Sequence, residues 1–166
     1  MGVGNVFLIL ILFLQHVFFL SPLPIYFDSP EYVHLIQNPD LIQALTSGHE
    51  PIHPGYILPA WIFTQTFPFL NAVYSAELVS SLFGSLALFI FYKISRILFG
   101  QKIAVRALII ASFLPVFFLS SVNVLTDTTY IFFYLLSFYC LLRSKNTFNR
   151  WFWVGVASLV YSIFTH

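Results

Sequence analysis

The stretches Tyr26-Phe-Asp-Ser-Pro-Glu-Tyr32 and His49-Glu-Pro-Ile-His-Pro-Gly-Tyr56 bound the one long polar interval of this sequence. The interval contains four of the six carboxylates and three of the five histidines, but no lysine or arginine. These residues are Asp28, Glu31, Asp40 and Glu50, with His34, His49 and His53. Since hydrophobic segments flank the interval on both sides, we expect the chemistry of the protein to lie here.

The composition excludes an ordinary soluble domain. Of the 166 residues, 59% are hydrophobic and 8% are charged, whereas soluble domains are typically about 25% charged. The single cysteine, Cys140, lies in an apolar run, so there is no disulfide framework. We therefore predict an all-α, polytopic transmembrane helical bundle, and we expect no nucleic-acid partner.

Five apolar segments are predicted to span the membrane, and the first, about 18 residues or roughly 27 Å long, approaches a bilayer core of about 30 Å. They are Val3–Leu20, Ala72–Tyr92, Ala104–Val122, Thr128–Leu142 and Trp151–Phe164. Residues 1–166 then form a single transmembrane module. Its parts are a first span (1–25), an external acidic loop (26–70) and four further spans (71–166).

Three short helices are expected in the external loop. Two amphipathic ones begin at Asp28 and Asp40, and we place them flat on the membrane surface. The third, Tyr56–Phe67, is about 12 residues or roughly 18 Å long, too short to cross the membrane. Pro59 is predicted to interrupt it and Pro68 to end it.

The charges support this topology through the positive-inside rule. With the N-terminus inside, all seven basic residues fall in two cytoplasmic loops, and all six carboxylates lie outside or at the outer ends of helices. The basic residues are Lys93, Arg96, Lys102, Arg106, Arg143, Lys145 and Arg150.

Small residues at helical spacing predict where helices pack closely, because small side chains let helix backbones approach in a membrane. They are Ala76, Ser80 and Gly84, then Ala104, Ala107 and Ala111, then Gly155, Ser158 and Ser162.

Two interpretations are open for Asp28-Ser-Pro-Glu31. The pair can form a capping box, in which Asp28 accepts a backbone hydrogen bond and Glu31 reaches back to the helix start. Alternatively, Asp28 is a carboxylate at the membrane surface that takes a proton from an incoming hydroxyl. The motif itself is short and common, which favours the cap.

His49, Glu50 and Asp127 are candidate ligands for a divalent metal ion such as Mg²⁺, Mn²⁺ or Zn²⁺. The spacing of His49-Glu-Pro-Ile-His53 matches no standard zinc site, and a polar turn before a helix is the alternative. Asp127, flanked by threonines, can equally cap the helix that follows it.

The order of these parts resembles the GT-C glycosyltransferases, which include the protein O-mannosyltransferases and the aminoarabinose transferases. The resemblance rests on Asp28-x-x-Glu-Tyr32, His53-Pro-Gly-Tyr-Ile-Leu58, Tyr92-Lys-Ile-Ser-Arg-Ile-Leu-Phe-Gly100, and Thr126-Asp127 before an aromatic-rich span. It covers nearly the whole chain and matches the N-terminal half of the family. We therefore expect the chain to be incomplete at its C-terminus.

The resemblance implies a role for each matching residue. Asp28 would be the general base, with Glu31 beside it in the acidic pair. Asp127 would be a second external acid that helps to bind a metal or position the acceptor. His53 and Tyr56 would line the donor cavity, although Gly55 replaces a common proline of that motif.

The resemblance also implies a polyprenyl-phosphate sugar donor and sugar transfer on the external or lumenal face of the membrane. The departing lipid phosphate needs positive charge, yet no lysine or arginine is expected on that face. A divalent ion, or a lysine or arginine from a C-terminal half or partner subunit, would supply this positive charge. The expected location is the bacterial inner membrane or the endoplasmic reticulum, among membrane lipids. The alternative is a small non-catalytic scaffold or accessory subunit.

Overall fold

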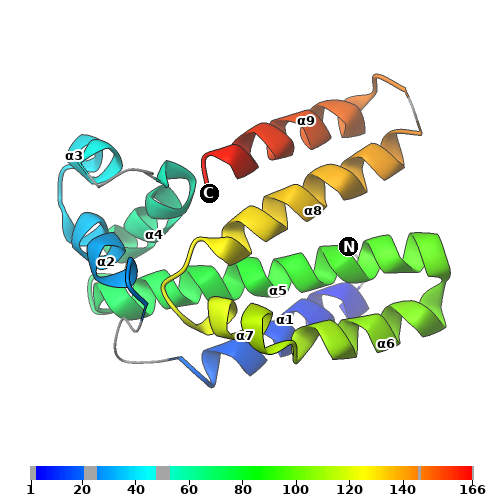
Figure 1. The fold of residues 1–166 in the computed structure, drawn as a ribbon, viewed down its shortest axis with the longest axis horizontal. Coiled ribbons are helices and arrows are strands. Elements are labelled where there is room, and N and C mark those ends of the chain that lie inside the picture. The colour runs from blue at the N-terminus through cyan, green and yellow to red at the C-terminus, as the bar shows by residue number, and fades with distance from the viewer. Residues whose placement is uncertain (1–2, 21–25, 48–52, 146, 166) are drawn as a thin grey trace.

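A computed structural model describes residues 3–20, 26–47, 53–145 and 147–165 of the protein (Figure 1). These residues form nine α-helices and no β-strand, which confirms the predicted all-α fold. The helices are α1 (Val3–Val17), α2 (Ser29–Gln37), α3 (Leu41–Thr46), α4 (Pro54–Thr66), α5 (Ala72–Phe99), α6 (Gln101–Ser112), α7 (Pro115–Val122), α8 (Asp127–Ser144) and α9 (Arg150–Ile163).

The long helix α5 organises the bundle. It packs against α1, α6, α7 and α8, and α9 packs along α8 on the side away from α1 (Figure 1). The short helices α2, α3 and α4 gather at the N-terminal end of α5, where α7 and α9 end and α8 begins. This end of the bundle therefore collects segments that lie far apart in the sequence.

Only part of the expected membrane topology is evident from helix length and composition. In the described parts of the chain, α5 is long and apolar enough to cross a membrane, and α6 with α7 makes a second candidate span if the bent pair counts as one. The prediction of five spans is thus reduced to one or two by this criterion. One reason is length: α1 and α9 have 15 and 14 residues, whereas a bilayer core needs about 20. The other is composition: α8 has 18 residues but includes Asp127 and Arg143, so it is not apolar enough.

The span expected at Ala104–Val122 is broken, which corrects that prediction. The axes of α6 and α7 differ by 64° across the break. Leu114 has an extended backbone (φ −63°, ψ 120°) and Pro115 begins α7. Proline disfavours a helical conformation in the residue before it and lacks the N–H that would continue the helix, so the break falls at this position.

Pro59 does not interrupt α4, contrary to the sequence prediction, because the helix runs through it from Pro54 to Thr66. A proline at this position leaves the carbonyl of Gly55, four residues earlier, without its helical donor. The hydroxyl of Tyr161 on α9 donates to that carbonyl at 3.0 Å. A hydrogen bond from a distant helix therefore replaces the one that Pro59 removes.

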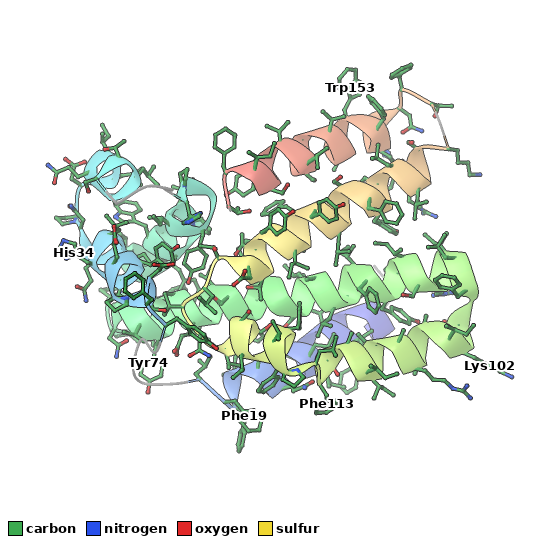
Figure 2. All side chains as sticks on the ribbon, viewed as in Figure 1. Phe19, His34, Tyr74, Lys102, Phe113 and Trp153 are labelled. Atoms are coloured by element: carbon green, nitrogen blue, oxygen red, sulfur yellow. The ribbon has the colours of Figure 1, made fainter. Side chains whose placement is uncertain are left out.

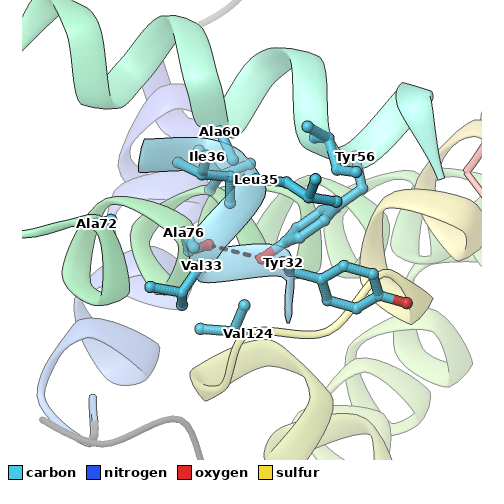
Figure 3. Close-up of a cluster of buried hydrophobic side chains, with 11 residues drawn as sticks. Tyr32, Val33, Leu35, Ile36, Tyr56, Ala60, Ala72, Ala76 and Val124 are labelled. Atoms are coloured by element: carbon cyan, nitrogen blue, oxygen red, sulfur yellow. Dashed lines mark hydrogen bonds between the residues drawn. The ribbon is translucent and has the colours of Figure 1, made fainter. Parts of the chain in front are cut away.

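The apolar faces of α2 and α4 are covered by protein. Tyr32, Ile36 and Ile57 are buried in a cluster that also includes residues of α5 (Figure 3). The indole of Trp61 on α4 donates to the carbonyl of Asn38 at the end of α2 (2.7 Å). The apolar face of α2 is therefore packed on α4 and α5, and the placement of α2 flat on the membrane surface stays a prediction.

The small residues mark close helix contacts, as predicted. A Cβ atom added at Gly84 would lie 2.9 Å from the Cβ of Ser121 on α7. At Gly155 on α9 it would lie 3.2 Å from the carbonyl oxygen of Ser137 on α8. These glycines let neighbouring helices approach as closely as they do.

The structure separates the charges between the two ends of the bundle. The basic residues lie at the C-terminal ends of α5 and α8, the start of α9 and the N-terminal half of α6, as Lys102 illustrates in Figure 2. The described carboxylates lie at the opposite end, on or beside α2, α3 and the first turns of α5 and α8. We refer to these as the basic end and the acidic end.

Candidate functional site

The candidate site residues that the structure describes come together at the acidic end. Asp28 and Glu31 lie at the start of α2, and Asp127 is the first residue of α8. His53 and Tyr56 lie at the start of α4. The fold thus joins three segments that are separated by up to a hundred residues in the sequence.

Tyr32 lies at the centre of this group. Its ring contacts those of His53 and Tyr56 edge-on, with centroids 5.6 Å and 5.8 Å away. Figure 3 shows its hydroxyl directed away from the apolar side chains around it. Sequence reasoning included Tyr32 in the Asp28-x-x-Glu-Tyr32 motif but gave it no role, so its contacts with His53 and Tyr56 were missed.

The charges of three carboxylates act on the Tyr32 phenol. Burial is the largest cause that raises its pKa to about 12, and three negative charges raise it further. The charges are those of Asp28, Glu31 and Asp127. We call these three residues and Tyr32 the carboxylate cluster. It contains both acids of the predicted pair and the predicted second external acid.

Asp28 occupies a cap position without acting as a side-chain cap. Its carbonyl accepts from the backbone N–H of Tyr32 (3.1 Å), but its side chain makes no cap hydrogen bond. Its backbone is helical (φ −86°, ψ −14°), whereas a capping residue is typically extended. The capping-box interpretation of Asp28 therefore does not account for its carboxylate.

At two other helix starts the side chain of the N-cap residue does accept backbone hydrogen bonds. Asp40 has an extended backbone and accepts from the N–H groups of Ile42 (2.9 Å) and Gln43 (3.3 Å). Asn71 accepts from Tyr74 at 2.8 Å. The Asp28 carboxylate, at a half-buried position, is held differently from both.

Tyr56 is fully buried and joins α4 to α5. Its hydroxyl donates to the carbonyl of Ala76 (3.2 Å; Figure 3). It also lies 3.1 Å from the hydroxyl of Ser80. Burial raises its pKa well above the usual value; Ser80 lowers it in part, and the charge of the buried Glu77 raises it. Tyr56 thus links Tyr32, which its ring contacts, to helix α5.

Hydrogen bonds from hydroxyl groups to backbone carbonyls connect the start of α8 and the residues before it to α2 and α5. Ser29 donates to the carbonyl of Val124 (2.8 Å), and Ser80 to that of Leu125 (3.2 Å). Thr128 donates to the carbonyl of Ser80 at 3.1 Å. These bonds hold Asp127 beside α2. Sequence reasoning treated Ser80 only as a small packing residue and did not single out Ser29 or Thr128.

His53 is buried at the start of α4, next to the C-terminal end of α9. The N–H of Gly55 donates to the carbonyl of Phe164 at 2.7 Å. This contact explains the departure noted at Gly55, because proline has no N–H to donate. It also fixes the turn that presents His53 to Tyr32.

Comparison with protein-family models adds independent information about the chain. Residues 49–161, more than half of the sequence, match the model described as dolichyl-phosphate-mannose-protein mannosyltransferase. The chain belongs to this mannosyltransferase family. Its members are membrane glycosyltransferases that use polyprenyl-phosphate-sugar donors. The matched residues include His53, Tyr56 and Asp127, while Asp28 and Glu31 precede them. Neither the curated proteins nor the solved structures contain a match.

A metal site in this family member stays a prediction. Within the described ranges, His, Cys, Asp and Glu side chains form no group of three that could hold a metal ion. His49 and Glu50, two of the three predicted ligands, lie outside the described residues. We therefore derive no step through a metal ion.

The Tyr32 phenol is expected to titrate at a higher pH than an ordinary tyrosine. The phenol of Tyr32 should remain protonated at pH 10 and titrate near 12. The folded protein holds this proton more tightly than the unfolded chain, so the associated stability is full below about pH 10 and is lost as the pH rises toward 12. Subtracting the tyrosinate absorbance of Tyr32→Phe from that of the wild type isolates this titration. Asp127→Asn should lower the Tyr32 pKa, and an unchanged value would place Asp127 outside the cluster.

Proposed function

We propose that the protein is the part of a membrane glycosyltransferase that carries the general base, and that it transfers a sugar from a polyprenyl-phosphate donor to an acceptor on the outer face of the membrane. The observation that carries this proposal is the carboxylate cluster. It brings two acids of α2 and one of α8 to one end of the bundle in a member of the mannosyltransferase family.

The orientation follows from the separated charges. The positive-inside rule places the basic end in the cytoplasm, so the acidic end, with the carboxylate cluster, faces the outside or the lumen. The rods formed by α1, α5, α6 with α7, α8 and α9 alternate in direction between the two ends (Figure 1). This alternation supports five passages, with the shorter helices crossing as part of the packed bundle. The membrane is the bacterial inner membrane or that of the endoplasmic reticulum.

Asp28 is the residue to which we assign the general base. Its carboxylate makes no cap hydrogen bond and lies in a half-buried position beside Glu31 and Tyr32. The acceptor hydroxyl gives its proton to Asp28 as its oxygen bonds to the sugar carbon. The bond from that carbon to phosphate breaks, and the polyprenyl phosphate leaves with the electron pair.

Glu31 and Asp127 position the acceptor rather than the leaving group. The charges of both act on Tyr32, and carboxylate oxygens accept hydrogen bonds from donors such as sugar or protein hydroxyls. The leaving phosphate requires positive charge, and the described basic residues all lie at the other end. A lysine or arginine from a C-terminal half or a partner subunit would provide this positive charge.

A transfer assay separates the enzyme from the non-catalytic scaffold. Membranes from cells that express the protein together with its C-terminal half or partner subunit should transfer labelled mannose or aminoarabinose from a polyprenyl-phosphate donor to protein or glycan fractions, above the level of membranes that lack the protein. Asp127→Asn should weaken this transfer, and Asp40→Asn should not, since Asp40 lies outside the carboxylate cluster. If no donor gives transfer above that level, the scaffold interpretation holds.

A further inference from the structure

A second polar site lies at the basic end, far from the carboxylate cluster. It is a pocket of about 330 Å³ between α5 and α8. Its lining residues are Lys93, Arg96, Ile97, Tyr139 and Arg143. Three of the five side chains are cationic, and they come from two different helices.

Aromatic side chains indicate the depth of this pocket in the membrane. The rings of Tyr139 and Trp151 meet edge-on at 6.4 Å, and the guanidinium of Arg143 lies 5.8 Å from the Trp151 ring. Tyrosine and tryptophan concentrate at the level of lipid headgroups, where their rings are half in hydrocarbon and half in water. The pocket therefore opens at the headgroup layer.

The charge of the pocket defines its ligand. Arg96 and Arg143 are exposed residues, and arginine binds phosphate through two parallel hydrogen bonds. The described carboxylates lie at the opposite end of the bundle, so the local field is positive. An anion with several oxygen acceptors, such as a phosphate group, fits this lining.

The apolar part of the rim favours a lipid over a free anion. Ile97 is 49% exposed beside the cationic side chains, so a ligand that binds here also meets hydrocarbon. The volume is at the lower end of ordinary ligand sites, which span about 300–1,000 Å³. It accommodates a small headgroup but not a large glycan.

We propose that this pocket binds the phosphate headgroup of an anionic phospholipid in the leaflet at the basic end. The site is separate from the sugar-transfer site, and the proposal does not depend on the proposed function. Clusters of basic residues next to membrane helices attract anionic lipids with a free energy that grows with each cation. Here the cations are gathered into one pocket, so the binding is local and saturable.

Lipid binding to the purified full chain tests the proposal. In phosphatidylcholine-containing micelles, fluorescent phosphatidylglycerol should bind saturably and about tenfold more tightly than fluorescent phosphatidylcholine. The double variant Arg96→Gln/Arg143→Gln should lose most of this preference. The matched control, Lys102→Gln/Arg106→Gln, removes two exposed bases of the same end that do not line the pocket. It should retain the preference.

Three results would overturn the proposal. One is equal affinity for the two lipids, and a second is an equal loss in both double variants, which would indicate a diffuse field. The third is displacement of phosphatidylglycerol by inorganic phosphate or glycerol phosphate at matched concentrations, which would indicate a soluble-anion site. The melting temperature of each variant in phosphatidylcholine micelles shows whether it is folded.

Discussion

Asp28→Asn is expected to reduce sugar transfer by roughly 10² to 10⁴, the usual contribution of a general base, while leaving the melting temperature almost unchanged. The carboxylate at this position makes no cap hydrogen bond, so the substitution removes no side-chain cap from α2. Asparagine keeps the size of the side chain and removes its ability to take a proton. The measurement is initial transfer rate from a polyprenyl-phosphate donor, at equal amounts of folded protein in the membrane.

Asp40 provides a matched control with the opposite pattern. Its side chain accepts two backbone hydrogen bonds at the start of α3, so Asp40→Ala should cost about 1 kcal/mol of stability. Because Asp40 lies outside the carboxylate cluster, transfer per folded molecule should stay at the wild-type level. Transfer that survives in Asp28→Asn would remove the base assignment from this residue, whatever happens at Asp40.

Gly55→Ala is the second change for which we expect a large effect, in this case on stability. A Cβ atom at this position would lie 2.9 Å from the carbonyl oxygen of Phe164 and would collide with the Thr165 side chain. The same carbonyl accepts from the N–H of Gly55, so moving α9 away also breaks that hydrogen bond. Overpacking of this kind typically costs about 1–3 kcal/mol. The thermal midpoint in detergent should fall accordingly.

The hydroxyl of Tyr161 offers a second measurement of the same contact. Tyr161→Phe leaves the Gly55 carbonyl without the donor that replaces the missing N–H of Pro59, and an unsatisfied buried acceptor costs about 1–3 kcal/mol. Tyr134→Phe removes a hydroxyl from an exposed position on α8 and should be nearly neutral. If Gly55→Ala and Tyr161→Phe both melt like the wild type, the end of α9 does not dock on α4 as described.

The local sequence was sufficient to predict most helices and the division of charge. Long apolar segments, proline positions and capping residues predicted the helices and several of their ends, and Asp40 caps α3 as its sequence pattern indicates. Two errors involve proline. The span ending at Val122 breaks at Pro115, whereas α4 continues through Pro59. Whether a proline ends a helix depends on what replaces the lost hydrogen bond, and at Pro59 the replacement comes from a residue about a hundred positions away.

For the candidate site, too, one part could be predicted from the sequence and another part required the tertiary structure. The sequence by itself determined which carboxylates lie outside the apolar segments, because charged residues are costly in a membrane core and collect at helix ends. It also determined the family, through residues 49–161. Only the tertiary structure decided that the charges of Asp28, Glu31 and Asp127 all act on Tyr32, and that the Asp28 side chain makes no cap hydrogen bond. The physical reason is that α2 and α8 meet through hydrogen bonds and packing on α5, such as that of Ser29 with Val124, and such long-range contacts leave no periodic signal in the sequence.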